Sequence, residues 1–300
     1  MRLQAAIGVV LLVVAPGATS VPAQEHIELY AVVLDGTTRD PVQTLAPGDL
    51  VVQEDGQAAR VVAVEPTNWP VKLQVLVDNG QGLGSTNIQL LKDGLTNLIE
   101  TLPEDVEVTL VSTSPQPRFL TRATTDRAEL MDGLSRLAPD NGAGRFTESL
   151  VEATERTERD ESPHFPVIMS VATSIGDANV RERDVNRIFA RLVEKPIQVH
   201  VVMLGGTSNS ASGGANTTRI GIAVTGGTGG RYENIAIANR LPGLLAELGA
   251  QIAESHRLSS RQYRLDVERP EGKSGDLGQM GAGATGGRIV RSLSRDGRIR

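Results

Sequence analysis

Residues 73–113 read LQVLVDNGQGLGSTNIQLLKDGLTNLIETLPEDVEVTLVST, and this stretch decides the fold. It begins with a compact apolar strand at residues 73–77 and continues with a polar loop that opens on Asp78. Apolar residues then recur at helical spacing over residues 88–102, and a second apolar strand follows at residues 106–112. Strand, helix and strand in this order are typical of a parallel sheet covered by helices.

The same alternation continues toward the carboxyl end of the chain. Thr86 with Gln89, and Asp126 with Glu129, have the spacing that begins a helix. Further helices are expected at residues 126–137, 147–159, 185–193 and 241–252, and further strands at residues 166–172, 197–204 and 262–267. We therefore predict an α/β fold, a doubly wound and mostly parallel sheet, over residues 70–268. The glycine-rich segments 205–214 and 226–230 interrupt this pattern and predict turns.

A small β module precedes this domain. Residues 24–66 show short apolar stretches with a period near two, separated by turns at Asp35-Gly36 and Asp55-Gly56. Residues 66–70 are interpreted as a linker. After the α/β domain, residues 269–300 form a tail rich in glycine and arginine, which we expect to be mobile, although its Ile289-Val290 could add an edge strand.

The first 23 residues have the composition of a signal peptide. Arg2 is followed by an apolar run over residues 5–15 and by small residues that end in Ala23. The run is shorter than the roughly 20 residues that span a bilayer, and no later stretch could cross one. We therefore predict cleavage after Ala23 and a secreted or periplasmic protein, with an uncleaved anchor as the alternative.

Composition excludes several classes of function. The net charge of -6 repels nucleic-acid phosphates, and an aromatic content of 3% supplies few stacking platforms for bases. No nucleic-acid partner is therefore expected. The chain has no cysteine, which removes disulfides, thiolate metal sites and cysteine nucleophiles. No serine lies in a Gly-x-Ser-x-Gly elbow, and the glycine-rich segments lack the pattern of a phosphate-binding loop.

The order of these segments resembles a known family. Residues 73–113 look like the start of a von Willebrand factor A domain, and residues 197–206 and 224–270 are similar to its last third. Residues 32–56 resemble the small β module that precedes such domains in secreted bacterial proteins. The resemblance implies a Rossmann-like fold and a protein-binding role.

The resemblance also implies a metal-ion-dependent adhesion site, in which an Asp-x-Ser-x-Ser loop, a Thr and a second Asp hold a divalent cation. Asp78 stands at the first Asp, but Gly80 and Gly82 stand at the two Ser positions. Gly144 stands at the Thr, three residues before Thr147. At the second Asp this chain has Ala172 or Thr173, with Asp177 further along. Because glycine offers no side-chain oxygen, we expect a degenerate site that holds neither a metal nor another cofactor.

The functional prediction is a secreted, non-enzymatic interaction module that binds an unidentified protein partner without a cation. Asp78 could be a residual metal ligand, a hydrogen-bond acceptor that faces the partner, or a cap that fixes its own loop. One alternative is cation-dependent adhesion with Asp78, Thr147 and Asp177 as rearranged ligands, and the other is a secreted hydrolase with an unrecognised site. The predicted partner-binding residues are Asp78, Asn79, Gly80, Gln81, Gly82, Gly144, Thr147 and Thr173.

Overall fold

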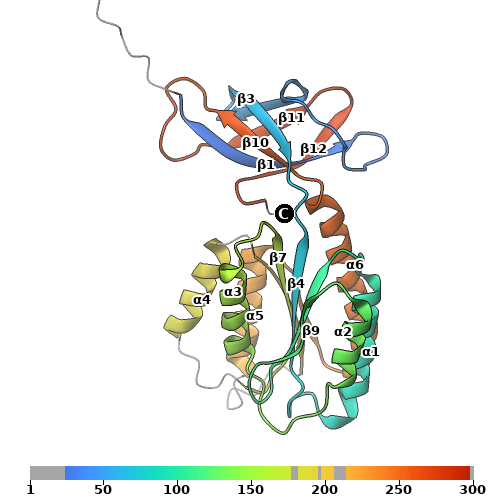
Figure 1. Ribbon diagram of the computed structural model, residues 1–300. Coiled ribbons are helices and arrows are strands. Elements are labelled where there is room, and N and C mark those ends of the chain that lie inside the picture. Colours follow the sequence, from blue (N-terminus) through green and yellow to red (C-terminus); the bar gives the residue numbers. More distant parts are fainter. Residues whose placement is uncertain (1–23, 177–181, 195–196, 206–213, 298–300) are drawn as a thin grey trace, which may run out of the picture.

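The computed structural model describes residues 24–176, 182–194, 197–205 and 214–297. The predicted signal segment, residues 1–23, and Asp177 lie outside these residues. The described chain forms two units, an antiparallel β unit and an α/β unit (Figure 1). Within the described residues, no helix is long and apolar enough to span a membrane.

The α/β unit is built on a six-stranded sheet with the order β6-β5-β4-β7-β8-β9. All neighbouring strands are parallel except β6, which runs antiparallel to β5. This confirms the predicted mostly parallel, doubly wound sheet. The strands are β4 (Val71–Val77), β5 (Glu107–Ser112), β6 (Arg118–Thr124), β7 (Phe165–Thr173), β8 (Gln198–Leu204) and β9 (Tyr232–Ile235). Every residue of β7 is buried, as expected for a central strand covered on both faces.

Helices cover both faces of this sheet (Figure 1). One layer consists of α1 (Ile88–Thr101), α2 (Arg127–Ser135) and α6 (Leu241–Ser259), and the other of α3 (Phe146–Arg159), α4 (Glu182–Glu194) and α5 (Gly214–Thr228). Gly94 lets α1 and α6 approach closely, because a Cβ there would lie 2.8 Å from Leu245 Cδ1 and 3.0 Å from Leu241 O. Short 3-10 turns occur at Pro47–Asp49, Ser85–Asn87 and Ala238–Arg240.

Two local expectations are corrected. The turn predicted at residues 226–230 is in large part the end of α5, a helix that we did not predict. Its Ile220 and Val224 are buried against the sheet, so packing stabilises a segment of low helix propensity. The capping box at Thr86 and Gln89 is absent, because α1 begins after Asn87 without a side-chain cap. By contrast, Asp126 caps α2 as expected, through Ala128 N and Glu129 N.

The antiparallel unit combines both ends of the described chain. Its order is β11-β2-β3-β10-β1-β12, with β1 (His26–Asp35), β2 (Leu50–Glu54), β3 (Gln57–Pro66), β10 (Tyr263–Glu268), β11 (Met280–Ala284) and β12 (Arg288–Ser294). Residues 262–267, expected in the parallel sheet, therefore lie between β3 and β1 in this second sheet. The physical reason is that Leu265 and Val267 complete an apolar core that the amino-terminal strands cannot close alone. The tail expected to be mobile supplies β11 and β12, with β12 as the edge strand that Ile289-Val290 indicated.

The buried side chain of Arg269 connects the segment after β10 to strand β2 by hydrogen bonds. The side chains of Arg269 and Glu54 are both almost fully buried. The guanidinium donates two hydrogen bonds to the Glu54 carboxylate, from Nε at 3.0 Å and from Nη2 at 2.6 Å. The remaining N–H groups of Arg269 donate to the Glu25 carboxylate and to the carbonyl oxygens of Gly275 and Asp276. All five donors of the guanidinium are therefore used, which makes this buried charge tolerable.

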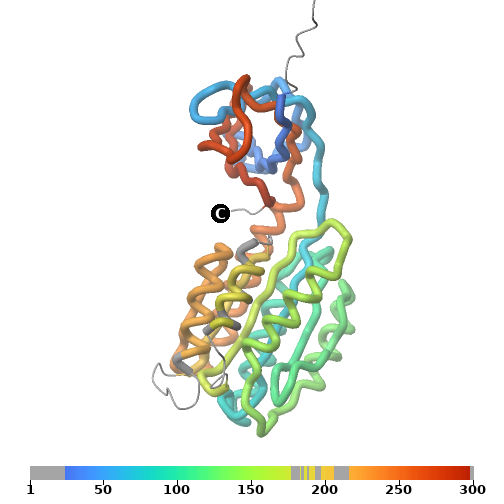
Figure 2. Tube along the Cα trace, turned by 90° about the vertical axis from the view of Figure 1, so that its left-hand side faces the viewer, coloured from blue at the N-terminus to red at the C-terminus, as the bar shows by residue number. Residues whose placement is uncertain are grey.

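The chain crosses between the two units twice, from β3 to β4 and from α6 to β10 (Figures 1 and 2). Trp69 packs at the first crossing, with its ring centroid 5.5 Å from that of Tyr30 in β1 and 5.2 Å from that of Phe165 in β7. These aromatic contacts link the two units at the amino ends of the parallel strands. The opposite, carboxyl ends of the strands are therefore directed away from the β unit (Figure 1).

Candidate functional site

The candidate site lies where the strand order of the parallel sheet reverses. From β4, the chain first adds β5 on one side and later adds β7 on the other. Ligands of doubly wound sheets bind outside the carboxyl ends of the strands at such a point. Asp78 directly follows β4, and Thr173 is the last residue of β7. The structure therefore brings these two predicted residues together, from positions 95 residues apart.

The Asp78 carboxylate is buried, and both of its oxygens accept hydrogen bonds from the protein. Oδ1 accepts from Gly80 N at 2.9 Å and from Ser114 Oγ at 2.8 Å. Oδ2 accepts from Thr173 Oγ1 at 2.5 Å and from Thr173 N at 3.2 Å. Four donors from three loops therefore converge on one carboxylate that is only 3% exposed.

Gly80, Gly82 and Gly144, which the sequence resemblance aligned with side-chain ligands, leave no room for a side chain. A Cβ on Gly144 would lie 2.3 Å from Asp78 Oδ2. A Cβ on Gly80 would lie 2.4 Å from Ser114 Oγ, and one on Gly82 would lie 2.0 Å from Thr173 Oγ1. The hydroxyl groups of Ser114 and Thr173 thus fill the space beside the carboxylate, and the backbone of all three glycines packs closely around it.

Further hydrogen bonds tie the loop after Asp78 to the loop before α3. Asn79 Nδ2 donates to Ala138 O at 2.7 Å, and Asp140 N donates to Asn79 O at 2.8 Å. Gln81 N donates to Gly142 O at 3.0 Å, and the Gln81 side-chain amide also bonds to the carbonyl of Asn141. We call the loops at residues 78–87, 113–118, 138–145 and 173–176 the rim. Its central part is held rigidly by these contacts.

Burial divides the predicted site residues into two groups. Asp78, Asn79, Gly80, Gly144, Thr147 and Thr173 are buried. Gln81 is exposed and Gly82 is partly exposed. Thr147 lies in the first turn of α3 and is not one of the four donors to Asp78. The buried residues therefore shape the rim, and the exposed residues lie around them.

Sequence reasoning missed Ser114, which donates directly to Asp78. The available signal was its position: Ser114 follows β5 closely, just as Asp78 follows β4, and both strands end at the same edge of the sheet. Two other hydroxyl or amide oxygens of the rim, Asn79 Oδ1 and Thr113 Oγ1, are buried without a hydrogen-bond partner.

Other parts of the described chain offer less chemistry. Within the described residues, no group of three or more acidic, histidine or cysteine side chains could hold a metal ion. His200 is fully buried in β8, where its Nδ1 accepts a hydrogen bond from Arg231 N at 3.1 Å. Burial, and secondarily the charge of Arg231, lower the pKa of His200 to about 4, so it is neutral at physiological pH.

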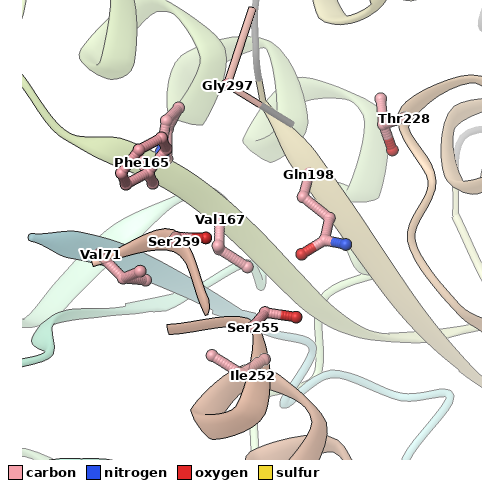
Figure 3. Close-up of a pocket in the computed structure, with 10 residues that line it drawn as sticks. Val71, Phe165, Val167, Gln198, Thr228, Ile252, Ser255, Ser259 and Gly297 are labelled. Atoms are coloured by element: carbon pink, nitrogen blue, oxygen red, sulfur yellow. The ribbon is translucent and has the colours of Figure 1, made fainter. Parts of the chain in front are cut away.

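A hollow lies at the opposite end of the parallel sheet, and Figure 3 shows the residues that line it. It is lined by the first residues of β4 and β7 and by the carboxyl-terminal half of α6, with Val71, Phe165, Ile252 and Ser255 among them. No charged side chain lines it. Gln198 Nε2, at its edge, already donates to Gly229 O at 3.1 Å. This hollow therefore lacks the charged or reactive groups of a catalytic site.

The sequence and the fold were compared with those of known proteins. Residues 73–174 match the family model of the von Willebrand factor type A domain. The comparison with curated proteins gave no match. A von Willebrand factor type A structure from Catenulispora acidiphila superposes with a TM-score of 0.54 at 13% identity, covering 92% of this chain and 74% of that one.

A second similar structure is proximal thread matrix protein 1 from the mussel byssus, described with a zinc-occupied MIDAS motif. It superposes with a TM-score of 0.50 at 10% identity, covering 69% of this chain and 50% of that one. At these identities the structural likeness establishes the fold alone. The α/β unit therefore has the fold of von Willebrand factor type A domains, and residues 73–174 match the model of that family.

Proposed function

We propose that this chain is a secreted, non-enzymatic interaction module that binds a protein partner at the rim without a divalent cation. The observation that carries this proposal is the state of Asp78. Both oxygens of its carboxylate accept hydrogen bonds from Ser114, Thr173 and the backbone, so the negative charge is already stabilised by the protein.

The residues of the rim do not fit a divalent cation. Mg²⁺ requires near-octahedral coordination by oxygen and is usually held by one or two carboxylates. Among the residues that the structure describes, Asp78 is the single carboxylate at the centre of the rim, and both neighbouring hydroxyls donate their hydrogen to it. Gly80, Gly82 and Gly144 add no side-chain oxygen, and side chains there would collide with the groups that hold Asp78. We therefore assign no metal to this site.

Exposed residues around the buried centre supply the proposed contact surface. They come from three rim loops and include Gln81, Ser85, Thr86, Gln116, Arg118, Asn141, Ala143 and Arg145, of which only the two arginines are charged. Because the loops beneath them are fixed by hydrogen bonds, this surface is organised before a partner arrives. Such preorganisation reduces the entropy lost on binding.

The proposed cleavage after Ala23 is compatible with the contacts of the residues that follow it. Gln24 Nε2 donates to Arg269 O at 3.2 Å, and the Glu25 carboxylate contacts the Arg269 guanidinium at 2.9 Å. A mature chain that begins at Gln24 retains both contacts. Mass spectrometry of the protein from its producing cell should give an amino terminus at Gln24, and an intact Met1 on the exported protein would refute the cleavage.

The binding proposal is tested with tryptophan substitutions on the rim. Partners are cross-linked in the envelope of the producing cell, identified by mass spectrometry, purified and titrated against Ala143→Trp, Thr86→Trp and the control Ala250→Trp on the exposed face of α6. We expect both rim variants to weaken binding at least tenfold, whereas the control and an excess of chelator leave it unchanged.

Two outcomes would overturn the proposal. Unchanged binding of both rim variants would place the contact elsewhere on the molecule. Loss of binding in chelator with recovery in Mg²⁺ would instead support cation-dependent adhesion.

A further inference from the structure

Arg145 is the last residue of the rim loop at residues 138–145, directly before α3, and its side chain is exposed. It follows Gly144, which packs against the Asp78 carboxylate, and it precedes α3. Its backbone N donates to Thr113 O at 3.1 Å, and its carbonyl accepts from Ser149 N at 2.9 Å. Nε donates to Pro115 O at 3.2 Å. Among the described residues, Nη1 and Nη2 have no partner, and the side chain is exposed.

The other charges of the rim are already compensated. Asp78 is buried among four donors, as described above. Asp140 accepts a hydrogen bond from Gly142 N and lies 3.7 Å from an Arg118 nitrogen. Glu148, in the first turn of α3, forms no ion pair with Arg145 among the described residues. Arg145 is therefore the one exposed charged group in the described rim loops that forms no ion pair.

This arrangement favours an anion. A guanidinium held by Nε presents its two Nη groups in the fork geometry that binds a carboxylate through two hydrogen bonds. The amino end of the 14-residue helix α3 begins beside it and adds a partial positive charge in the same place. Thr113, which accepts the Arg145 backbone hydrogen bond, also has a buried hydroxyl without a partner. The Asp78 carboxylate is buried and accepts four hydrogen bonds, so Arg145 is the exposed charge beside it.

We propose that Arg145 binds an aspartate or glutamate side chain of the protein partner and thereby serves as a fixed cation at the rim. This inference rests on the proposed function, which places the partner at this surface. It extends that function by naming the chemistry of recognition: an acidic side chain meets a guanidinium, and no metal ion takes part.

A small probe tests the recognition without knowledge of the partner. N-acetyl-aspartate N-methylamide is titrated into the ¹⁵N-labelled full chain in chelator, and N-acetyl-asparagine N-methylamide serves as the uncharged control. The aspartate probe should shift the amide signals of Gly144 and Phe146 and the Arg145 Nε–H signal. The asparagine probe should leave them in place.

Matched variants assign the effect to the guanidinium. Arg145→Gln should abolish the shifts, whereas Arg159→Gln, at the exposed carboxyl end of the same helix, should retain them. The remaining spectrum of each variant shows whether the fold is intact. Equal shifts with both probes, or unchanged shifts in Arg145→Gln, would overturn the proposal.

Binding to the purified partner separates this inference from the proposed function. We expect Arg145→Gln to weaken partner binding at least tenfold and Arg145→Lys to restore part of the loss, because lysine keeps the charge without the fork. If Ala143→Trp blocks binding and Arg145→Gln does not, the rim is the binding surface but the carboxylate contact is wrong. If neither variant weakens binding, the proposed function itself fails.

Discussion

Replacement of Asp78 by alanine tests whether the carboxylate stabilises the fold through its hydrogen bonds or is a metal ligand that destabilises the fold when no cation is bound. The side chain accepts from two backbone N–H groups, those of Gly80 and Thr173, and from the hydroxyls of Ser114 and Thr173. The hydroxyls can rotate toward other acceptors, but the backbone groups cannot. Each buried donor left without an acceptor costs about 1–3 kcal/mol, so Asp78→Ala should destabilise the fold by about 3–5 kcal/mol.

The assay is urea unfolding in chelator, followed by far-ultraviolet circular dichroism and by the fluorescence of Trp69, the single tryptophan of the chain. Coincident transitions by both probes would justify a free energy of unfolding. Asp78→Asn keeps one acceptor oxygen and should lose less stability than Asp78→Ala. Equal or greater stability of Asp78→Ala in chelator would refute the reasoning, because it would mean that the carboxylate is uncompensated without a cation.

Three further perturbations follow from the packing. The pKa of His200 is about 4 in the folded protein, below its value near 6.5 in the unfolded chain. As the pH falls, the unfolded state therefore takes up the proton first. The free energy of unfolding should decline by about 3 kcal/mol in total between pH 6.5 and pH 4. His200→Leu should flatten that part of the curve of unfolding free energy against pH, and an unchanged slope would exclude this histidine as the cause. Gly82→Ala should cost about 1–3 kcal/mol, because its Cβ would strike Thr173, whereas Gly226→Ala in α5 meets no atom within 4 Å and should be neutral or stabilising by denaturant titration. Arg269→Met leaves Glu54 buried without its partner, so β11 and β12 should lose hydrogen-exchange protection, while the exposed Arg264→Met should not; equal protection in both variants would contradict the fastening role.

The parallel sheet could be predicted because its signals are local. The apolar run of β7 and the amphipathic stripe of α1 each lie within one short segment, and their alternation along the chain determines the class of fold. The glycines at positions 80, 82 and 144 were also visible as departures from the family's ligand pattern. Their effect on the structure of the site could not be predicted. It depends on the hydroxyl of Ser114, which follows a different strand and donates to Asp78.

The second sheet could not be assigned from local signals. Strand β10 follows a helix, as a further parallel strand would, and its partners β1 and β3 lie about 200 residues or more away in sequence. Its alternation of buried Tyr263 and Leu265 with exposed Arg264 is the one feature that pointed to an antiparallel, half-exposed strand. Helix α5 was missed for a related reason, since glycine and threonine disfavour helix locally and its stability comes from packing against β8.

The most direct test of the central claim is a Mn²⁺ titration followed by amide NMR. Mn²⁺ prefers the same oxygen ligands as Mg²⁺ and broadens the signals of nearby nuclei by its paramagnetism. The account predicts that the amides of Gly80, Gly82, Gly144 and Thr173 broaden no more than those of exposed loops elsewhere. Selective broadening of these four signals at low Mn²⁺, reversed by added Mg²⁺, would show a cation bound beside Asp78 and would contradict the account.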